Sequence, residues 1–191
     1  IQGRNDLSTL TKEGQLQAEA AGKTISSIPI DAIYSSPLQR ASETTKIIIE
    51  QHQRDLQAIY TDELLEVDLG PWSGLTKNEI KNDFPQELSV WQKEPKELTI
   101  NKDDGTKFQP IKELLYQAEH FLKYLFNTYS GSNKTILIVA HNAILRCLIL
   151  KLINEPSQGF RRIKLDNTSI SICSIDFKNW EDRQVQIQCL N

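Results

Sequence analysis

Residues 135–142 read Thr-Ile-Leu-Ile-Val-Ala-His-Asn, an apolar and largely β-branched run that ends in a histidine. A run without polar alternation is typical of a strand buried on both faces, as in a parallel sheet covered by helices. The apolar stretch Ala143–Ile153 follows at once and predicts a buried helix. The two segments together predict a strand-to-helix junction with His141 at the turn.

Helices and strands alternate along the rest of the chain. The run Ser36-Pro37-Leu38-Gln39 predicts a helix start in which Ser36 is the cap and Gln39 completes a capping box. Alternation around a doubly buried strand predicts an α/β fold, a three-layer α/β/α sandwich with a mostly parallel sheet. The predicted helices cover 11–27, the segment after Ser36, and 110–129, and the predicted strands cover 31–35, 58–61, 168–177 and 184–190.

The 191 residues suit one domain, 1–191, because the chain holds no internal repeat and no low-complexity linker. Prolines interrupt the stretch 84–109 at Pro85 and Pro95, and we expect a surface excursion there that lies near the site. Loops of that length in compact domains commonly serve function.

Composition excludes several classes of function. The net charge of -3 attracts neither nucleic acid nor an anionic membrane surface, and no apolar run approaches the roughly 18 residues of a membrane span. Three cysteines without CxxC spacing indicate reduced thiols and a cytoplasmic protein, with no structural metal. Phosphate-loop and dinucleotide motifs are absent, so we expect no cofactor.

Two predicted strand-to-helix junctions carry residues suited to an anion. His141 follows the most buried strand, and Arg40 lies in the first turn of the helix after the strand 31–35. Free backbone N–H groups at a helix start attract anions, and ligands bind at the carboxyl ends of parallel strands. The pattern leaves open a structural role for His141 and an exposed position for Arg40.

Four strings resemble the histidine phosphatase superfamily (phosphoglycerate-mutase-like, branch 1) and occur in the family's order. Residues 35–44 are similar to its S-S-x-L-x-R-A-x-x-T, and 64–75 are similar to L-x-E-x-x-x-G-x-W-x-G-x. Residues 139–146 resemble V-x-H-x-x-x-x-R, and 2–18 resemble the Q-G-led segment that follows the family's nucleophile. The strings span nearly the whole chain.

The resemblance implies a role for each matching residue. Arg40 would hold the phosphoryl group, Glu66 would be the general acid that protonates the leaving oxygen, and His141 would contact the phosphoryl oxygens. It also implies substrate-binding positions, which are Gly3, Asn5 and Asn142. No metal is required by this scheme.

One family feature is absent from this sequence. The family's first strand ends in Arg-His-Gly, whose histidine is phosphorylated, and no Arg-His pair occurs here. That strand lies in the middle of the family sheet, so its loss would leave two strand edges unpaired. We therefore expect the 191 residues to be an N-terminally truncated segment of a longer protein.

The expected function is hydrolysis of a small phosphorylated metabolite, such as a sugar phosphate, through a phosphohistidine. A phosphoglycerate mutase would use the same residues and is the first alternative. A phosphate-ester-binding module without turnover is the second, if the 191 residues are the complete protein. The sequence leaves the substrate and the oligomeric state open, a homodimer being one option.

Overall fold

The computed structural model describes residues 1–102, 105–155, 157–177 and 179–190. Its central sheet has three parallel strands in the order β2-β1-β5, which are Ala58–Tyr60, Ala32–Ser35 and Ile136–Val139. Ser35 pairs with Val139 on one side and with Tyr60 on the other, so the carboxyl ends of β1 and β5 coincide. The strands predicted over 31–35, 58–61 and 135–140 are confirmed to within a residue or two.

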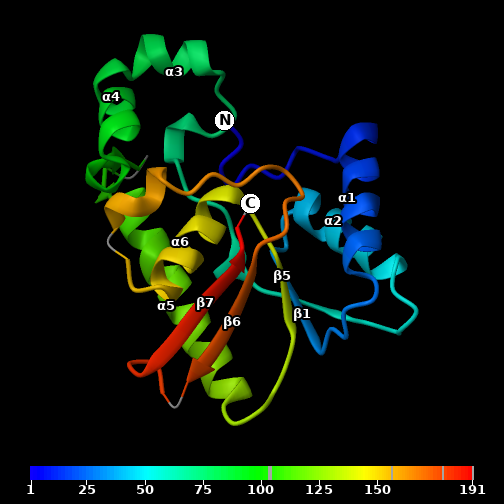
Figure 1. The fold of residues 1–191 in the computed structure, drawn as a ribbon. Helices are drawn as coiled ribbons and strands as arrows, with labels where there is room; N and C mark the ends of the chain where they lie inside the picture. The colour runs from blue at the N-terminus through cyan, green and yellow to red at the C-terminus, as the bar shows by residue number, and fades with distance from the viewer. Residues whose placement is uncertain (103–104, 156, 178, 191) are drawn as a thin grey trace.

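Helices cover both faces of this sheet (Figure 1). On β1, Ile33 packs with residues of α1 (Lys12–Ile25) and α2 (Gln39–Glu50), whereas Tyr34 packs with residues of α5 (Pro110–Tyr129) and α6 (Asn142–Leu152). Successive side chains of a strand point to opposite faces, so the two helix pairs form separate layers. The predicted three-layer α/β/α sandwich is confirmed.

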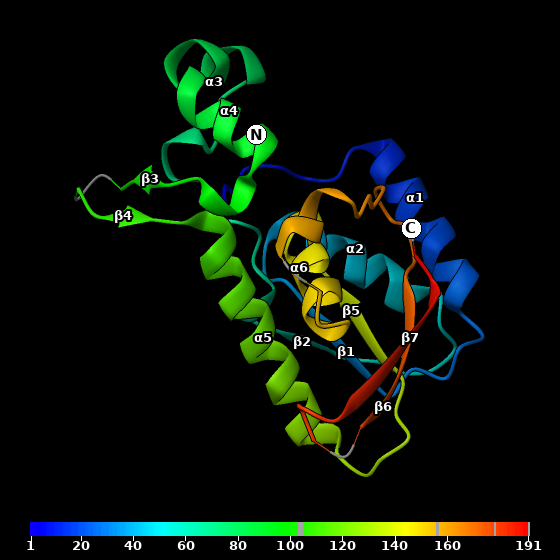
Figure 2. The ribbon, with the colours of Figure 1, turned by 60° about the vertical axis from the view of Figure 1, so that its left-hand side comes forward.

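The excursion over 84–109 is more ordered than predicted. It contains α4 (Pro85–Lys93), the 3-10 helix η3 (Pro95–Glu97) and a short hairpin of β3 (Ile100–Asn101) and β4 (Lys107–Phe108). Pro85 is the first helical residue of α4, a position where proline favours the helix. Ile100 and Phe108 are buried and anchor the segment to the core, whereas no residue of α4 is buried. Figure 2 shows the hairpin of β3 and β4 extending to one side of the molecule, beyond the start of α5.

Shorter elements connect the layers. Thr76 and Glu79 form a capping box that begins α3, Lys77–Asp83. Among the described residues, no helix is both long and apolar enough to cross a bilayer. The remaining 3-10 helices are η1 (Asp62–Leu64), η2 (Gly70–Trp72) and η4 (Ser157–Arg161).

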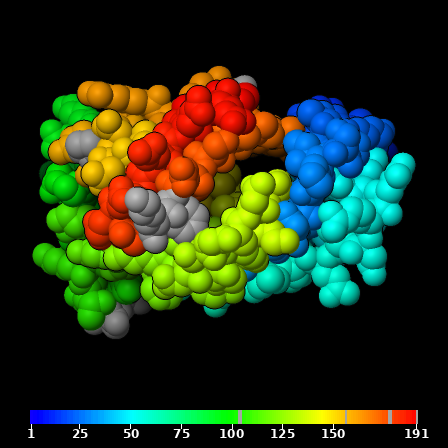
Figure 3. Space-filling model, turned by 60° about the horizontal axis from the view of Figure 1, so that its bottom comes forward, coloured from blue at the N-terminus to red at the C-terminus, as the bar shows by residue number. Residues whose placement is uncertain are grey.

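The prediction that strand β5 is buried on both faces is wrong. Ile136 to Val139 are each only partly buried, and β1 is the one strand that pairs with β5 among the described residues. A cavity of about 1370 Å³ runs along β5 and is also lined by residues 170–175. Figure 3 shows this hollow between the C-terminal segment, the residues that lead into β5, and α1. The apolar run therefore faces open space where a neighbouring strand would cover it.

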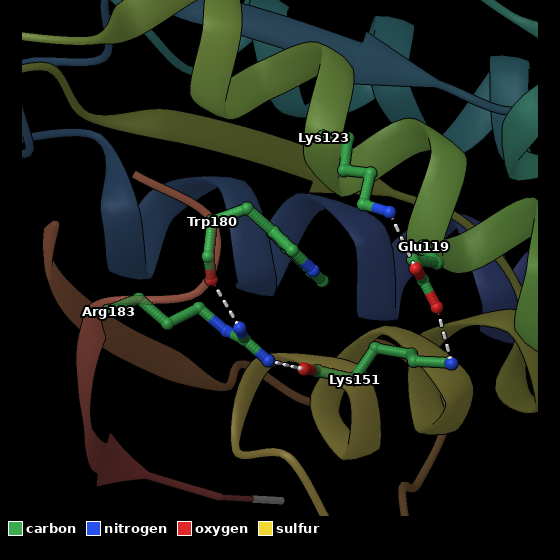
Figure 4. A network of polar contacts seen from close by, with 5 residues as sticks. All are labelled: Glu119, Lys123, Lys151, Trp180 and Arg183. Carbon is green, nitrogen blue, oxygen red and sulfur yellow. Dashed lines mark hydrogen bonds and ion pairs between the residues drawn. The ribbon is translucent and has the colours of Figure 1, made fainter. Parts of the chain in front are cut away.

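The last two strands form a hairpin that is held to helices instead of to β5. Strands β6 (Ile172–Phe177) and β7 (Arg183–Cys189) pair antiparallel as a separate sheet. Arg183 donates to the backbone carbonyls of Lys151 (2.7 Å) and Leu152 (3.0 Å) at the end of α6. Glu119 of α5 binds Lys151 and Lys123, which joins α5 to α6 beside this contact (Figure 4). The hairpin is thereby fixed to the α5–α6 layer.

Candidate functional site

The carboxyl ends of β1 and β5 open into the large cavity described above. The first residues of the chain run across this end of the sheet (Figure 1). The residues that line the cavity include five that the sequence singled out: Gly3, Arg40, Glu66, His141 and Asn142. Residues up to 139 positions apart in sequence therefore meet at one edge of the sheet, where α/β folds bind ligands.

His141 lies between β5 and α6, as the sequence predicted, and serves as the N-cap residue of α6. Its Nε2 lies 2.8 Å from the Ser36 hydroxyl, and the residue is only 8% exposed. Burial, aided by the nearby positive charge of Arg40, lowers the pKa of His141 to about 3. The imidazole is therefore neutral near pH 7 and can exchange hydrogen bonds without carrying charge.

Glu66 projects into the start of α6. Its carboxylate accepts hydrogen bonds from the backbone N–H groups of Ala143 (3.1 Å) and Ile144 (3.4 Å), and from its neighbour Val67 (2.9 Å). These donors and Arg40 favour the ionised form, yet burial outweighs them and raises the pKa of Glu66. A carboxyl group with a raised pKa retains its proton to higher pH, which suits a proton donor.

Arg40 lies in the first turn of α2, but the helix begins differently from the prediction. The predicted Ser36–Gln39 capping box is wrong: α2 starts at Gln39, and no side chain of its N-cap residue bonds to it. The Ser36 hydroxyl is instead shared between His141 and the Leu38 N–H. Asp6, 33 residues away, accepts a hydrogen bond from the Gln39 N–H at 2.6 Å and replaces the local cap.

The Arg40 guanidinium is positioned by the N-terminal segment. It donates to the backbone carbonyls of Gly3 (2.8 Å) and Asn5 (3.0 Å). Gly3 has a φ of +53°, and a Cβ there would lie 2.8 Å from the Ser73 Oγ. A positive φ and a close neighbour both favour glycine, so this turn places Arg40 through its backbone.

The other two predicted substrate-binding residues are placed less favourably. The Asn5 side chain accepts a hydrogen bond from the Leu7 N–H and does not line the cavity. Asn142 lines the cavity, but its amide donates to the Leu165 carbonyl at 2.9 Å. Substrate contact by Gly3, Asn5 and Asn142 stays a prediction, as do the catalytic roles of Arg40, Glu66 and His141.

Sequence reasoning missed two residues that position the site, Ser36 and Asp6. Ser36 lies inside the string that carries the resemblance, but was interpreted only as a cap. Asp6 acts across 33 residues, and no local spacing signals that contact. The described residues contain no group of three or more His, Cys, Asp or Glu side chains placed to share a metal ion.

The arrangement suits chemistry on an anionic oxygen group. A guanidinium supplies fixed positive charge, a neutral imidazole supplies hydrogen bonding, and a carboxyl group with a raised pKa lies beside both. Such preorganised groups stabilise charge that develops on transferring phosphoryl or acyl oxygens. The free N–H groups of α6 are already used by Glu66, so the helix start orients the acid.

Comparison with known sequences identifies relatives along the whole chain. A model of the histidine phosphatase superfamily (branch 1) matches residues 1–188. A probable 2-carboxy-D-arabinitol-1-phosphatase of Arabidopsis thaliana is 32% identical over 191 residues. The match covers 100% of this chain but only 37% of the plant protein's length. A probable phosphoglycerate mutase of Salmonella arizonae is 30% identical over 182 residues, covering 94% of the chain and 79% of that protein.

Solved structures share the fold at lower identity. A mycobacterial glucosyl-3-phosphoglycerate phosphatase superposes with a TM-score of 0.83 at 21% identity, covering 100% of the chain and 91% of its own. The alpha-ribazole phosphatase of Shigella flexneri gives a TM-score of 0.82 at 22% identity, covering 100% and 87%. This likeness establishes the fold.

Proposed function

The chain belongs to the histidine phosphatase superfamily (branch 1), and on this premise we propose that it is the phosphatase domain of an enzyme that hydrolyses small phosphate monoesters. Relatives named as phosphatases support the proposal. Because the chain spans 37% of the length of its Arabidopsis relative, the activity of the whole protein is part of what is proposed.

The observation that carries the proposal is the environment of Glu66. A binding module needs positive charge for a phosphate but no proton donor. Glu66 is buried, carries a raised pKa and lies within electrostatic reach of Arg40, which suits it to protonate a leaving oxygen. Proton transfer by a positioned acid of this kind typically contributes about 10²–10⁴ in rate.

The proposed reaction has two steps. A histidine nitrogen attacks phosphorus, the bond from phosphorus to the ester oxygen breaks, and Glu66 transfers its proton to that oxygen. Glu66, now a carboxylate, takes a proton from water as the water oxygen attacks the phosphohistidine. Phosphate leaves, and histidine and protonated Glu66 are restored. Arg40 stabilises negative charge on the phosphoryl oxygens, and neutral His141 donates a hydrogen bond to them.

The nucleophilic histidine of this scheme belongs to a segment that precedes Ile1. We propose that this segment adds a strand between β5 and β6, which makes residues 1–191 the larger part of one domain. The cavity along β5 supports the idea, since it is lined by apolar residues of both strands, among them Leu137, Val139, Ile172 and Ile175. An unpaired parallel edge beside an apolar slot is a liability that an added strand removes.

A phosphoglycerate mutase remains the alternative, and one relative bears that name. A mutase must retain the phosphohistidine until a second alcohol accepts the phosphoryl group, so it releases little inorganic phosphate.

We further propose a reducing compartment such as the cytoplasm, in keeping with three free thiols at Cys147, Cys173 and Cys189.

The test is phosphate release by the protein expressed from its full gene, with two substrates of different leaving group. Glycerol 3-phosphate has an alkoxide leaving group that needs a proton, whereas p-nitrophenolate leaves without one. We expect Glu66→Gln to lower kcat/KM for glycerol 3-phosphate by about 10²–10⁴ and that for p-nitrophenyl phosphate far less. Glu63→Gln, a carboxylate outside the cavity, is the matched control and should retain both activities.

Three outcomes would contradict the proposal. Equal losses with both substrates would remove the proton-donor role of Glu66. Transfer of the phosphoryl group between positions of phosphoglycerate, with little phosphate released, would establish a mutase. Saturable binding of phosphate esters without turnover of either kind would leave a binding module.

A further inference from the structure

Two arginines of the cavity lie outside the group that the proposed reaction uses. Arg146 extends from the second turn of α6, and Arg161 is the last residue of η4. Both line the same cavity as Arg40, Glu66 and His141. Each guanidinium lies over an aromatic ring at 5.4 Å from the ring centroid, Arg146 over Phe160 and Arg161 over Trp91.

The rings of Trp91 and Phe160 hold these two guanidinium groups close together. The rings of Trp91 and Phe160 meet edge to face with centroids 6.3 Å apart. Arg161 also donates to the backbone carbonyl of Trp91, which fixes α4 against η4. The charges of Arg146 and Arg161 repel each other, and burial and this repulsion lower the pKa of Arg146.

The protein offsets these charges only in part, through the attraction between Glu66 and Arg146. Within the described ranges, no carboxylate lies within ion-pair distance of Arg146 or Arg161. The Nε of Arg146 is buried with no hydrogen-bond partner, an arrangement that normally destabilises a fold. Stacking on rings offsets part of this effect, but it satisfies no N–H donor. An anion in the cavity would satisfy both the donor and the charge.

Glu66 relates this pair to the proposed phosphoryl site. Its carboxyl group interacts electrostatically with Arg40 and also with Arg146. Arg40 and Arg146 are therefore both within electrostatic reach of the same side chain. A molecule that is held by its phosphoryl group at Arg40 and is only a few bonds long could present another group to Arg146.

We propose that Arg146 and Arg161 form a subsite for a second anionic group of the substrate, a carboxylate or a second phosphoryl group, so that the enzyme selects phosphate monoesters of acids over those of neutral alcohols. This inference rests on the proposed phosphatase function and adds a substrate class to it. The planar fork of a guanidinium binds carboxylate and phosphate oxygens in pairs. Arg161 lies outside the strings that carry the family resemblance, whereas Arg146 is the last residue of the string 139–146.

The experiment compares 3-phosphoglycerate with glycerol 3-phosphate, which differ by a carboxylate in place of a hydroxymethyl group. Fructose 1,6-bisphosphate against fructose 6-phosphate tests a second phosphoryl group in the same way. We expect the wild-type protein, expressed from its full gene, to prefer the more anionic member of at least one pair. Arg146→Gln and Arg161→Gln should each lower kcat/KM for that member about ten- to hundredfold, with less than about threefold change for its partner.

Control variants separate this subsite from a structural role. Arg162→Gln removes an exposed arginine next to Arg161 that does not line the cavity, and it should change neither substrate. Arg146→Lys keeps the charge but not the fork and should recover part of the selectivity. If Arg146→Gln does not fold, as judged by circular dichroism, Arg161→Gln and Arg146→Lys still decide the question.

Binding to the Glu66→Gln variant, measured by calorimetry, separates the two proposals. Tighter binding of 3-phosphoglycerate than of glycerol 3-phosphate, lost in Arg146→Gln, would support the subsite even if no turnover occurred. Normal turnover with equal losses for both members of each pair would overturn the subsite and leave the phosphatase intact. Wild-type indifference to the second anionic group would overturn it as well.

Discussion

Burial moves the pKa values of Glu66 and His141 in opposite directions, because it disfavours the charged form of each. The carboxyl group gains affinity for its proton and the imidazole loses affinity for one. Both residues are therefore uncharged over a range of pH in which exposed side chains of the same type would be ionised. In the proposed reaction, Arg40 would then be the principal charge that faces the phosphoryl group.

The lowered pKa of His141 predicts how stability depends on pH. The unfolded chain binds a proton at histidine below about pH 6.5, whereas folded His141 does so only near pH 3, so stability is lost as pH falls between these values. We expect His141→Gln to flatten this decline in the free energy of unfolding, measured by urea titration at several pH values. Parallel curves for His141→Gln and the wild type would contradict the assignment.

The raised pKa of Glu66 predicts the opposite dependence. Unfolded glutamate ionises above about pH 4.5, while folded Glu66 keeps its proton to higher pH, so stability is lost as pH rises through the folded pKa. Catalysis of the first step should decline over the same interval, because the acid is then ionised. Glu66→Gln should remove this part of the pH dependence of the free energy of unfolding. A variant that retains it would show that another group is responsible.

Gly3 positions Arg40 through its backbone and tolerates no side chain without adjustment. We expect Gly3→Ala to lower the free energy of unfolding by about 1–3 kcal/mol, because φ is +53° and the new Cβ would meet the Ser73 Oγ. Gly131→Ala is the matched control, since φ is +70° there and no atom lies within 4 Å of the added Cβ. Ser73→Ala should reduce the cost at Gly3 to that at Gly131. Equal costs without Ser73→Ala would argue that the close contact is unimportant.

At the scale of elements, Arg183 attaches the β6–β7 hairpin to α6, beside the packing of Trp180 and Ile187 on the core. Arg183 binds the last carbonyls of α6 and lies 4.0 Å over the ring of Trp180 (Figure 4). Basic side chains commonly satisfy the free carbonyls of a helix end. We expect Arg183→Met to lower the free energy of unfolding by about 2 kcal/mol, in line with charged hydrogen bonds. Arg162→Met, at an exposed position, should change it little.

Hydrogen exchange would locate the effect of Arg183→Met. Faster exchange confined to β6, β7 and the last turn of α6 is expected if the arginine attaches the hairpin. A uniform increase over the chain would instead indicate that Arg183 contributes only to global stability.

Elements with strong local patterns were predictable from sequence, and contacts between distant elements were not. The helical period fixed α5, and the unbroken apolar run fixed β5 as a strand. The start of α2 was wrong because its cap comes from Asp6 and because Ser36 bonds to His141. The family resemblance predicted a role for Glu66. Its position at the start of α6, however, depends on a contact with Ala143, which is 77 residues away in sequence.

At the scale of the whole molecule, the incomplete burial of strand β5 is the main departure from what its sequence predicts. Its sequence is that of a strand covered on both faces, and yet its residues are half-buried beside a cavity shared with β6. The apolar pattern is typical of a strand that is covered on both faces, and the proposed added strand would supply that cover. The same added strand would also carry the nucleophilic histidine of the proposed reaction. One segment would therefore supply both the cover for β5 and the nucleophile.

The added strand can be tested on two lengths of the same protein. We expect backbone amides of β5 and β6 to exchange at least about tenfold more slowly in the protein expressed from its full gene than in residues 1–191 alone, because new ladder hydrogen bonds would close their free edges. Strands β3 and β4, which lie apart from the cavity, are the internal reference. Equal exchange at β5 and β6 in both lengths would place the nucleophile elsewhere. Slower exchange there, together with phosphate release found only in the longer protein, would show that the same segment completes both the sheet and the site. The strand that fills the slot would then also carry its histidine to the edge of the sheet where Arg40, Glu66 and His141 meet.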